Sequence, residues 1–90
     1  MKTLIAAAAG QKQITISWFG ALAEERGLLE ETVDTTAHTA GDFLEDFASR
    51  HNVAGLRGHI RIAVNDEFAP PAHPLRSGDK VVFLMPFSGG

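Results

Sequence analysis

The residues best suited to chemistry lie at the C-terminal end of the chain. Pro86 and Phe87 are followed there by Ser88, Gly89 and Gly90. If the main-chain carboxylate of Gly90 is the reacting group, it must reach a catalytic centre inside another protein. Glycine has no side chain to collide with the walls of a channel, and its backbone adopts angles that other residues avoid. We therefore expect the Gly90 carboxylate to carry the reaction.

The residues before the final glycine are expected to deliver it. Pro86 fixes its own φ angle and has no N–H to donate to a sheet, so it should end the preceding strand and keep the tail extended. We expect Phe87 to anchor the tail in an apolar pocket of the partner. Ser88 and Gly89 complete this tail-insertion segment, which spans residues 86–90.

The rest of the sequence contains no familiar catalytic or metal-binding pattern. The chain has no cysteine, which excludes a thiolate metal site, a disulfide and a thiol nucleophile. No nucleophile elbow, zinc-protease motif or phosphate loop occurs. The four histidines stand at no metal-ligand spacing. They are His38, His51, His59 and His73. We expect no metal, no stably bound cofactor and no active site belonging to this chain alone.

Length and composition set the scale of the protein. Ninety residues with 44% hydrophobic content predict one domain with a modest core. The net charge of −3, without a basic block, argues against nucleic-acid binding. The apolar stretch of residues 4–9 is shorter than the roughly 7–15 residues of a secretory signal and the ~20 of a membrane span. We expect residues 1–12 to be a poorly ordered extension, and the protein to be cytoplasmic.

Hydrophobic periodicity predicts a strand and a short helix in the first third of the chain. Residues 13–19 alternate, with Ile14, Ile16 and Trp18 on one face, as in a half-buried strand. A short helix is expected over residues 21–26, closed by Gly27. A weaker strand is expected over residues 29–35, whose members Leu29, Glu31, Val33 and Thr35 share a face.

The main helix is expected to start at Thr39, whose hydroxyl can cap it, and to end at Asn52 or Gly55. Its apolar stripe has helical spacing and should face the core. The stripe comprises Phe43, Leu44, Phe47 and Ala48.

Two further strands are expected in the last third. Residues 59–65 form one, with Ile60, Ile62 and Val64 pointing inward, and Asn65-Asp66 forms a turn after it. The following stretch, with Pro70, Pro71 and Pro74, is expected to be irregular. Residues 81–85 are apolar on both faces, which indicates a central strand.

These elements predict an α+β domain over residues 13–85, with one main helix across one face of a mixed sheet. If Val81 and Phe83 face the helix, then Val82 and Leu84 lie on the opposite, open face near Ala63. An exposed apolar patch beside a functional tail is typical of a docking surface. We expect this surface to consist of Arg61, Ala63, Val82 and Leu84, with Arg61 at its polar rim.

From Ile14 to Gly90 the sequence resembles the MoaD-type small subunit of molybdopterin synthase, within the β-grasp, ubiquitin-like superfamily of MoaD/ThiS-like sulfur carriers. The matching stretches are residues 14–19, 39–45, 62–65, 73–81 and 83–90. The resemblance implies a β-grasp fold with a flexible C-terminal tail. It also implies a carrier that acts as the sulfur-donating subunit of a synthase.

The resemblance further implies a sequence of partners. A ubiquitin-activating-like adenylyltransferase would consume ATP to adenylate the Gly90 carboxylate. A persulfide sulfur donor would then displace AMP and leave a thiocarboxylate. The large subunit of molybdopterin synthase would receive the tail and pass its sulfur to a pyranopterin, building the dithiolene of the molybdenum cofactor.

Two alternatives remain open at the level of sequence. The chain is also compatible with a sister carrier of the thiamine or cysteine pathway, or with a ubiquitin-like modifier that joins Gly90 to lysines of other proteins. The second alternative is a β-grasp interaction module whose Gly-Gly end is incidental. Thiamine-pathway carriers are generally shorter and lack the His-Pro-Leu segment found here at residues 73–75.

Overall fold

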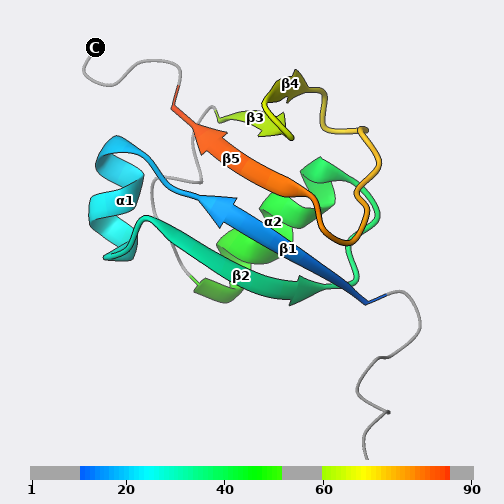
Figure 1. Ribbon diagram of the computed structural model, residues 1–90, viewed down its shortest axis with the longest axis horizontal. Coiled ribbons are helices and arrows are strands. Elements are labelled where there is room, and N and C mark those ends of the chain that lie inside the picture. The colour runs from blue at the N-terminus through cyan, green and yellow to red at the C-terminus, as the bar shows by residue number, and fades with distance from the viewer. Residues whose placement is uncertain (1–10, 52–59, 86–90) are drawn as a thin grey trace, which may run out of the picture.

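The computed structural model describes residues 11–51 and 60–85 of the chain. Two helices and five strands follow one another in this part of the sequence (Figure 1). They are β1 (Lys12–Ser17), α1 (Gly20–Arg26), β2 (Glu30–Thr35), α2 (Ala40–His51), β3 (Arg61–Val64), β4 (Glu67–Ala69) and β5 (Lys80–Leu84). The strands form one sheet in the order β2-β1-β5-β3-β4.

The sheet is mixed, as the sequence predicts. β1 pairs antiparallel with β2 and parallel with β5. β3 pairs antiparallel with both β5 and β4. β5 therefore lies in the middle of the sheet, and the prediction of a central strand is confirmed. The arrangement is the β-grasp, ubiquitin-like fold.

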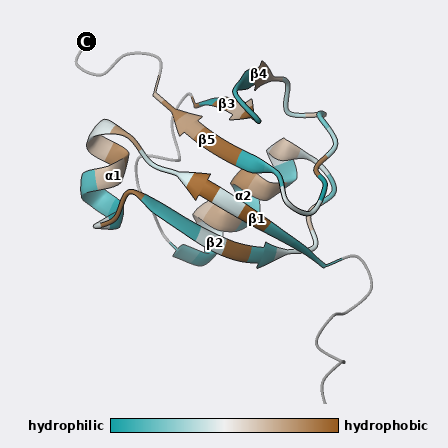
Figure 2. Ribbon diagram, in the orientation of Figure 1, coloured by the Kyte–Doolittle hydropathy of each residue, from teal (hydrophilic) through white to brown (hydrophobic). Residues whose placement is uncertain are grey.

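The core lies between α2 and one face of the sheet. β1 contributes Ile14 and Ile16 to it, and β5 contributes Val81 and Phe83; all four are 0% exposed. In Figure 2 the strongly hydrophobic bands lie on these two central strands, and the outer strand β2 is mostly hydrophilic. The aromatic rings of α2 pack against the sheet, with Phe43 stacked on Phe83 at 5.9 Å between centroids.

The C-terminal end of α1 and the N-terminal end of α2 are stabilised by the residues that the sequence predicts. Gly27 adopts φ 80° after α1, and its N–H donates to the Ala23 carbonyl at 2.8 Å. This left-handed conformation is one that glycine adopts without steric cost. At the start of α2, the Asp42 N–H donates to the Thr39 hydroxyl at 3.1 Å, which confirms the expected cap. The predicted end of this helix, at Asn52 or Gly55, lies outside the described residues.

One element was not expected. The stretch after Asn65-Asp66 was predicted to be irregular, but residues 67–69 form strand β4. The reason lies in the turn: Asn65 and Asp66 have φ 52° and 74°. Positive φ angles at both central residues match a two-residue hairpin turn whose twist suits the flanking strands. The chain therefore returns directly along β3, and pairing stops before Pro70, which has no N–H to donate.

The remaining differences concern strand ends. β1 begins at Lys12 and ends at Ser17, before Trp18, although the Trp18 side chain is buried as expected. β2 begins at Glu30, and Leu29 is 72% exposed. β5 runs from Lys80 to Leu84, one residue earlier than predicted. Residues 1–10 and the expected strand residue His59 lie outside the described part of the chain.

Candidate docking surface and tail attachment

The tail that carries the candidate reactive group leaves the middle of the sheet. β5 precedes it, held between β1 and β3. Met85 is the last described residue, and it is partly buried against the core. Residues 86–90, and with them the expected roles of Pro86, Phe87, Ser88, Gly89 and Gly90, lie outside the described residues.

The four residues expected to form the docking surface are brought together by strand register. Ala63 of β3 lies directly opposite Val82 of β5, and Arg61 lies opposite Leu84. Val82 and Leu84 are half-buried, and Arg61 is exposed. Because neighbouring positions on one strand point to opposite faces, these side chains share the face that α2 does not cover.

The register also extends this row of side chains across the sheet. Ser17 of β1 pairs with Val82, Val82 with Ala63, and Ala63 with Phe68 of β4. Phe68 is 64% exposed. The open face thus becomes more apolar from β1 toward β4.

An apolar hollow of about 240 Å³ lies on this face. Its lining residues come from three strands, the residue before α1 and the β3–β4 turn. They are Phe19, Ala63, Asp66, Phe68, Val82 and Leu84. We call this hollow, together with its rim residue Arg61, the open-face surface.

A second hollow, of about 180 Å³, adjoins the point where the chain leaves β5. It shares Phe19 and Leu84 with the first and is also lined by Met85, the last described residue before the tail. The apolar surface therefore continues from the sheet to the base of the tail.

Sequence reasoning missed two members of the open-face surface. Phe19 was assigned only to a strand end, and Phe68 fell in the stretch predicted to be irregular. Both are large apolar residues that are more than half exposed, at 57% and 64%. The signal for Phe68 was present in the sequence, because Asn65-Asp66 between two apolar stretches is compatible with a two-residue hairpin turn. No sequence signal placed Phe19 beside it.

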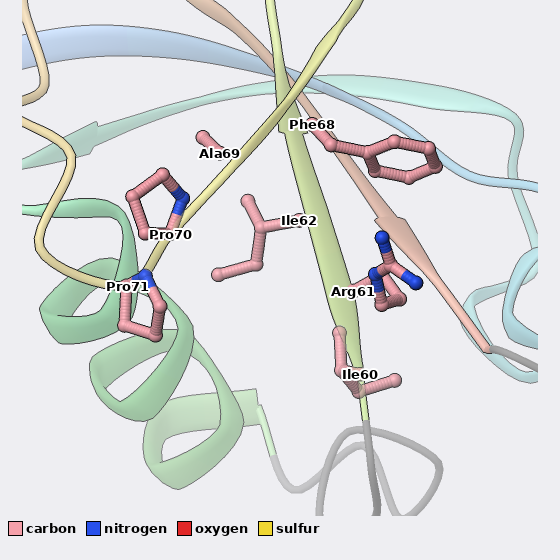
Figure 3. A pocket seen from close by; sticks show the side chains of 7 residues that line it. All are labelled: Ile60, Arg61, Ile62, Phe68, Ala69, Pro70 and Pro71. Carbon is pink, nitrogen blue, oxygen red and sulfur yellow. The ribbon is translucent and has the colours of Figure 1, made fainter.

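The rim of the open-face surface carries an ordered cation. The Arg61 guanidinium carbon lies 4.5 Å from the centroid of the Phe68 ring. Figure 3 shows both side chains on the same side of β3, with Pro71 beside α2. The two residues also line a hollow of about 370 Å³ at the edge of the sheet, together with Ile60 and Pro71 among others. Stacking of this kind holds a guanidinium in one orientation.

A partly buried ion pair lies next to the segment that carries Phe19. The Trp18 indole N–H donates to Glu31 Oε2 at 2.7 Å. Arg26 of α1 donates to both carboxylate oxygens of Glu31, at 2.7 and 2.6 Å. Burial raises the pKa of Glu31, but hydrogen bonds from Arg26 and Trp18 and the attraction of Arg26 and His51 outweigh it, so the pKa lies below its usual value. The pair thus links α1 and β2 to Trp18, the residue that follows β1 and precedes Phe19.

The described residues contain no cluster of histidine, cysteine or acidic side chains that could hold a metal ion. No helix among them is long and apolar enough to cross a membrane.

Known proteins with a similar sequence or structure belong to one family of small domains or share its fold. The model of the ThiS family matches residues 16–90. No curated protein gives a significant match. The crystal structure of SAMP1 from Haloferax volcanii is 27% identical with a TM-score of 0.71; it covers 87% of this chain and 99% of its own. The match therefore spans nearly the whole of that protein.

Two further similar structures are complexes with a second protein. The BexX/CysO complex of Amycolatopsis orientalis contains a chain 25% identical to this one, with a TM-score of 0.62 and coverage of 86% and 99%. The complex of molybdopterin-converting factor subunits 1 and 2 from Helicobacter pylori gives 23% identity, a TM-score of 0.59 and coverage of 87% and 99%. Together with the family match, these show the fold of a ubiquitin-like sulfur carrier or modifier.

Proposed function

The chain belongs to the ThiS family, and on that premise we propose that it is a sulfur carrier whose Gly90 carboxylate becomes a thiocarboxylate. The observation that carries the proposal is the position of β5. This central strand ends at Leu84, which lines the apolar open-face surface, the tail follows it in the sequence, and the family match continues to residue 90. The folded domain is then the part that partner proteins bind, and those partners supply the catalysis.

The chemistry requires activation because a carboxylate is a poor electrophile. An adenylating enzyme that docks on the open-face surface converts the Gly90 carboxylate to an acyl-adenylate at the expense of ATP. The outer sulfur of a persulfide donor then attacks the acyl carbon and displaces AMP, which is a good leaving group. A thiol reductant cleaves the S–S bond of the resulting acyl disulfide, so that the thiocarboxylate sulfur remains on Gly90 and the donor sulfur leaves as a disulfide with that thiol. The lack of cysteine in the chain suits this chemistry, because no side-chain thiol competes for the sulfur.

We further propose that the sulfur is used in molybdopterin synthesis, with this chain as the small synthase subunit. The support is the sequence resemblance, which includes the segment at residues 73–81. The fold is also shared with a putative molybdopterin converting factor subunit 1 from Pyrococcus furiosus, at 20% identity and a TM-score of 0.69. In this role the tail enters the large subunit, where its sulfur is transferred to the pterin precursor.

Intact-mass analysis tests the carrier proposal. Protein produced in a cell with its own activating enzyme should gain the mass of one oxygen-to-sulfur exchange, and fragmentation should place that exchange at Gly90. Persistent absence of the exchange would count against the proposal. Co-purification with a large synthase subunit would support the molybdopterin pathway over the thiamine and cysteine pathways.

A second candidate function has its own support. The likeness to SAMP1, at 27% identity over 99% of that chain, favours a small protein modifier. In that role the activated Gly90 forms an amide with lysine side chains of other proteins. Mass spectrometry of purified conjugates would then find Gly90 joined to a lysine amine, and a carrier used only for sulfur would give no such adducts.

A further inference from the structure

Strand β2 forms one edge of the sheet, and alternate residues of this strand point their backbone groups outward. It is the outermost strand on its side, in the order β2-β1-β5-β3-β4 (Figure 1). The N–H of Thr15 in β1 donates away from β2, to the Asp79 carbonyl at 3.1 Å. The N–H of Trp18 donates toward β2, to the Leu29 carbonyl at 2.8 Å. Because strand backbones alternate in this way, residues 31, 33 and 35 bond to β1, and three residues of β2 present their N–H and C=O groups to the outside. They are Glu30, Thr32 and Asp34.

The side chains of these three residues form an exposed row on the face of the sheet that α2 does not cover. Thr32 lies opposite Thr15 in the register, and their hydroxyl oxygens are 3.4 Å apart. Thr15 alternates along β1 with fully buried core residues, so both threonines point away from the core. Glu30 and Asp34 share this face, because side chains two positions apart in a strand point the same way. The row is therefore carboxylate, hydroxyl, carboxylate, and we call it the β2 edge.

Neither carboxylate of the β2 edge takes part in an ion pair within the described part of the chain. Lys80 of β5 is exposed and lies in the same cross-strand row as Thr32, with one residue of β1 between them. It places one positive charge on the far side of β1, against the two negative charges of Glu30 and Asp34. The β2 edge is therefore net negative.

On the opposite face of the sheet, the cations near β2 have other partners. Arg26 binds Glu31, with 2.6 Å between the closest nitrogen and oxygen, and His51 attracts the same carboxylate. Lys12 of β1 donates from Nζ to the Ala37 carbonyl at 3.0 Å. A chain segment lying alongside β2 on the outside would therefore meet the two carboxylates of the β2 edge as its nearest charges on the open face.

The charge pattern disfavours a second copy of this chain as that segment. Two copies of β2 paired antiparallel about Thr32 would set Glu30 of each copy against Asp34 of the other. Like charges directly opposite one another destabilise a strand pair. The other edge strand, β4, has three residues and is followed by Pro70, so it offers a much shorter template. The β2 edge thus suits a different strand of positive charge.

We propose that the β2 edge binds an extended, basic segment of a partner protein, which adds an antiparallel strand to the sheet. The segment carries lysine or arginine opposite Glu30 and Asp34, so its two basic residues are four positions apart. A β-branched residue between them lies opposite Thr32, where such cross-strand pairs are favourable. In this mode of recognition the main-chain hydrogen bonds supply affinity, and alternate side chains supply specificity.

This site is separate from the one that serves the tail. β1 lies between β2 and β5, and the β2 edge shares no residue with the open-face surface. A partner bound along β2 therefore need not displace an enzyme bound at the open-face surface. The inference goes beyond the proposed function, because it gives the carrier a second partner that takes no part in the sulfur chemistry.

Three short peptides, N-acetylated and C-amidated, test the proposal on the full chain. The matching peptide SKVTVKS sets its lysines four positions apart, with a threonine between them on the same face. The permuted peptide SVKTKVS has the same composition and charge, but its lysines are two positions apart and can meet only one carboxylate in any register. The peptide SEVTVES reverses the charge and keeps the strand pattern.

In NMR titrations, the matching peptide should shift the backbone amides of Glu30, Thr32 and Asp34 and slow their exchange with solvent, because their outward N–H groups become hydrogen-bonded. The permuted peptide should bind about twofold to fivefold more weakly, the range of one exposed ion pair. Glu30→Gln and Asp34→Asn should each weaken the matching peptide by a similar factor. Glu45→Gln makes the same charge change at an exposed position of α2 and should have no such effect.

The proposal is overturned if the matching peptide does not bind at millimolar concentration, if either other peptide binds as well, or if the shifts lie at β4 or at the open-face surface. An equal loss for Glu45→Gln would show unspecific attraction and also reject it. Concentration-dependent shifts of the same amides without peptide would assign the edge to a second copy and reject it too. None of these outcomes bears on the carrier function, because the titrations involve no sulfur and no tail residue.

Discussion

Glu31 shows how one ionised side chain can hold three elements of a small fold together. Its carboxylate accepts hydrogen bonds from Trp18 at the end of β1 and from Arg26 of α1. The Arg26 guanidinium also lies over the Phe47 ring, at 5.5 Å from its centroid. A charge-assisted, two-pronged arginine–carboxylate pair is stronger and more directional than a neutral hydrogen bond. The pair therefore holds α1 and β2 to Trp18, which directly precedes Phe19 of the open-face surface.

Glu31→Gln should lower the free energy of unfolding at pH 7 by about 1–2 kcal/mol, because two charge-assisted hydrogen bonds lose the charge that strengthens them. The folded pKa of Glu31 is depressed below the usual 4.5. The stabilisation is therefore complete above about pH 4.5 and is lost as the pH falls through the folded pKa. Urea unfolding at pH 7 and pH 3 measures this, and the difference between wild type and variant should be smaller at pH 3 than at pH 7.

Glu30→Gln is the matched control for this experiment. Glu30 is the adjacent residue of β2 and is exposed, so its replacement should change stability little at either pH. A loss of stability equal to that of Glu31→Gln would show that the pair with Arg26 is not its cause.

Leu84→Asp should weaken binding to the adenylating enzyme more than tenfold while lowering the melting temperature only modestly. The side chain faces the open-face surface, where an aspartate would remove apolar contact area and would have to be desolvated when the partner docks. Titration calorimetry and thermal unfolding measure the two effects. The neighbouring Phe83 is 0% exposed on the opposite face, so Phe83→Ala should instead cost about 3–5 kcal/mol of stability. A comparable loss for Leu84→Asp would contradict its assignment to the open face.

At the scale of elements, the contact between α2 and the segment after β4 depends on a glycine. The Gly41 N–H donates to the Pro71 carbonyl at 2.8 Å, near the start of the helix. A Cβ at Gly41 would lie 2.8 Å from the Pro71 Cβ and 3.1 Å from its carbonyl oxygen. The presence of glycine at position 41 is therefore explained by the close approach of the two backbones and not by helix propensity.

Gly41→Ala should destabilise the protein by about 1–3 kcal/mol, although alanine is the better helix former. The clash with Pro71 involves a proline ring and a backbone carbonyl, which cannot move as a flexible side chain can. Chemical denaturation gives the free energy of unfolding. Ser49→Ala, at an exposed position of the same helix, changes helix propensity without introducing a clash. It should be neutral or slightly stabilising. Stabilisation by both substitutions would show that α2 and the 70–71 segment separate easily.

At the scale of the whole molecule, the proposed carrier consists of a folded binding domain and a reactive tail. The core residues come from α1, α2, the strands β1, β3 and β5, Trp18 and the segment around Leu75, all within the described residues. The proposed reactive group lies beyond Met85 in the sequence. Stability and reactivity should therefore be separable by mutation.

Deletion of Gly90 should abolish sulfur loading and leave the melting temperature within about 2 °C of wild type, because the core described above is built from residues 14–83. Intact-mass analysis and thermal unfolding measure these two outcomes. Ser88→Ala is the control, since it alters the tail but keeps both final glycines, and it should still acquire sulfur. Sulfur loading of the chain without Gly90 would refute the assignment of the reactive group.

Local pattern alone determined most of the fold. Strict alternation identified β1, helical spacing and a capping threonine identified α2, and an apolar stretch identified β5 as central. These signals are strong because each arises within a single element, from the geometry of the strand or helix itself. The four expected surface residues could be placed for the same reason, once the two faces of β5 were distinguished. The Gly-Gly ending also came from the sequence alone.

Tertiary structure alone decided how the open-face surface is completed. Phe19 and Phe68 are 49 positions apart in the sequence, from 19 to 68, and only the pairing of β1, β5, β3 and β4 brings them to one hollow. Such contacts depend on strand order and register, which arise from packing across the whole sheet. No single stretch of sequence encodes them.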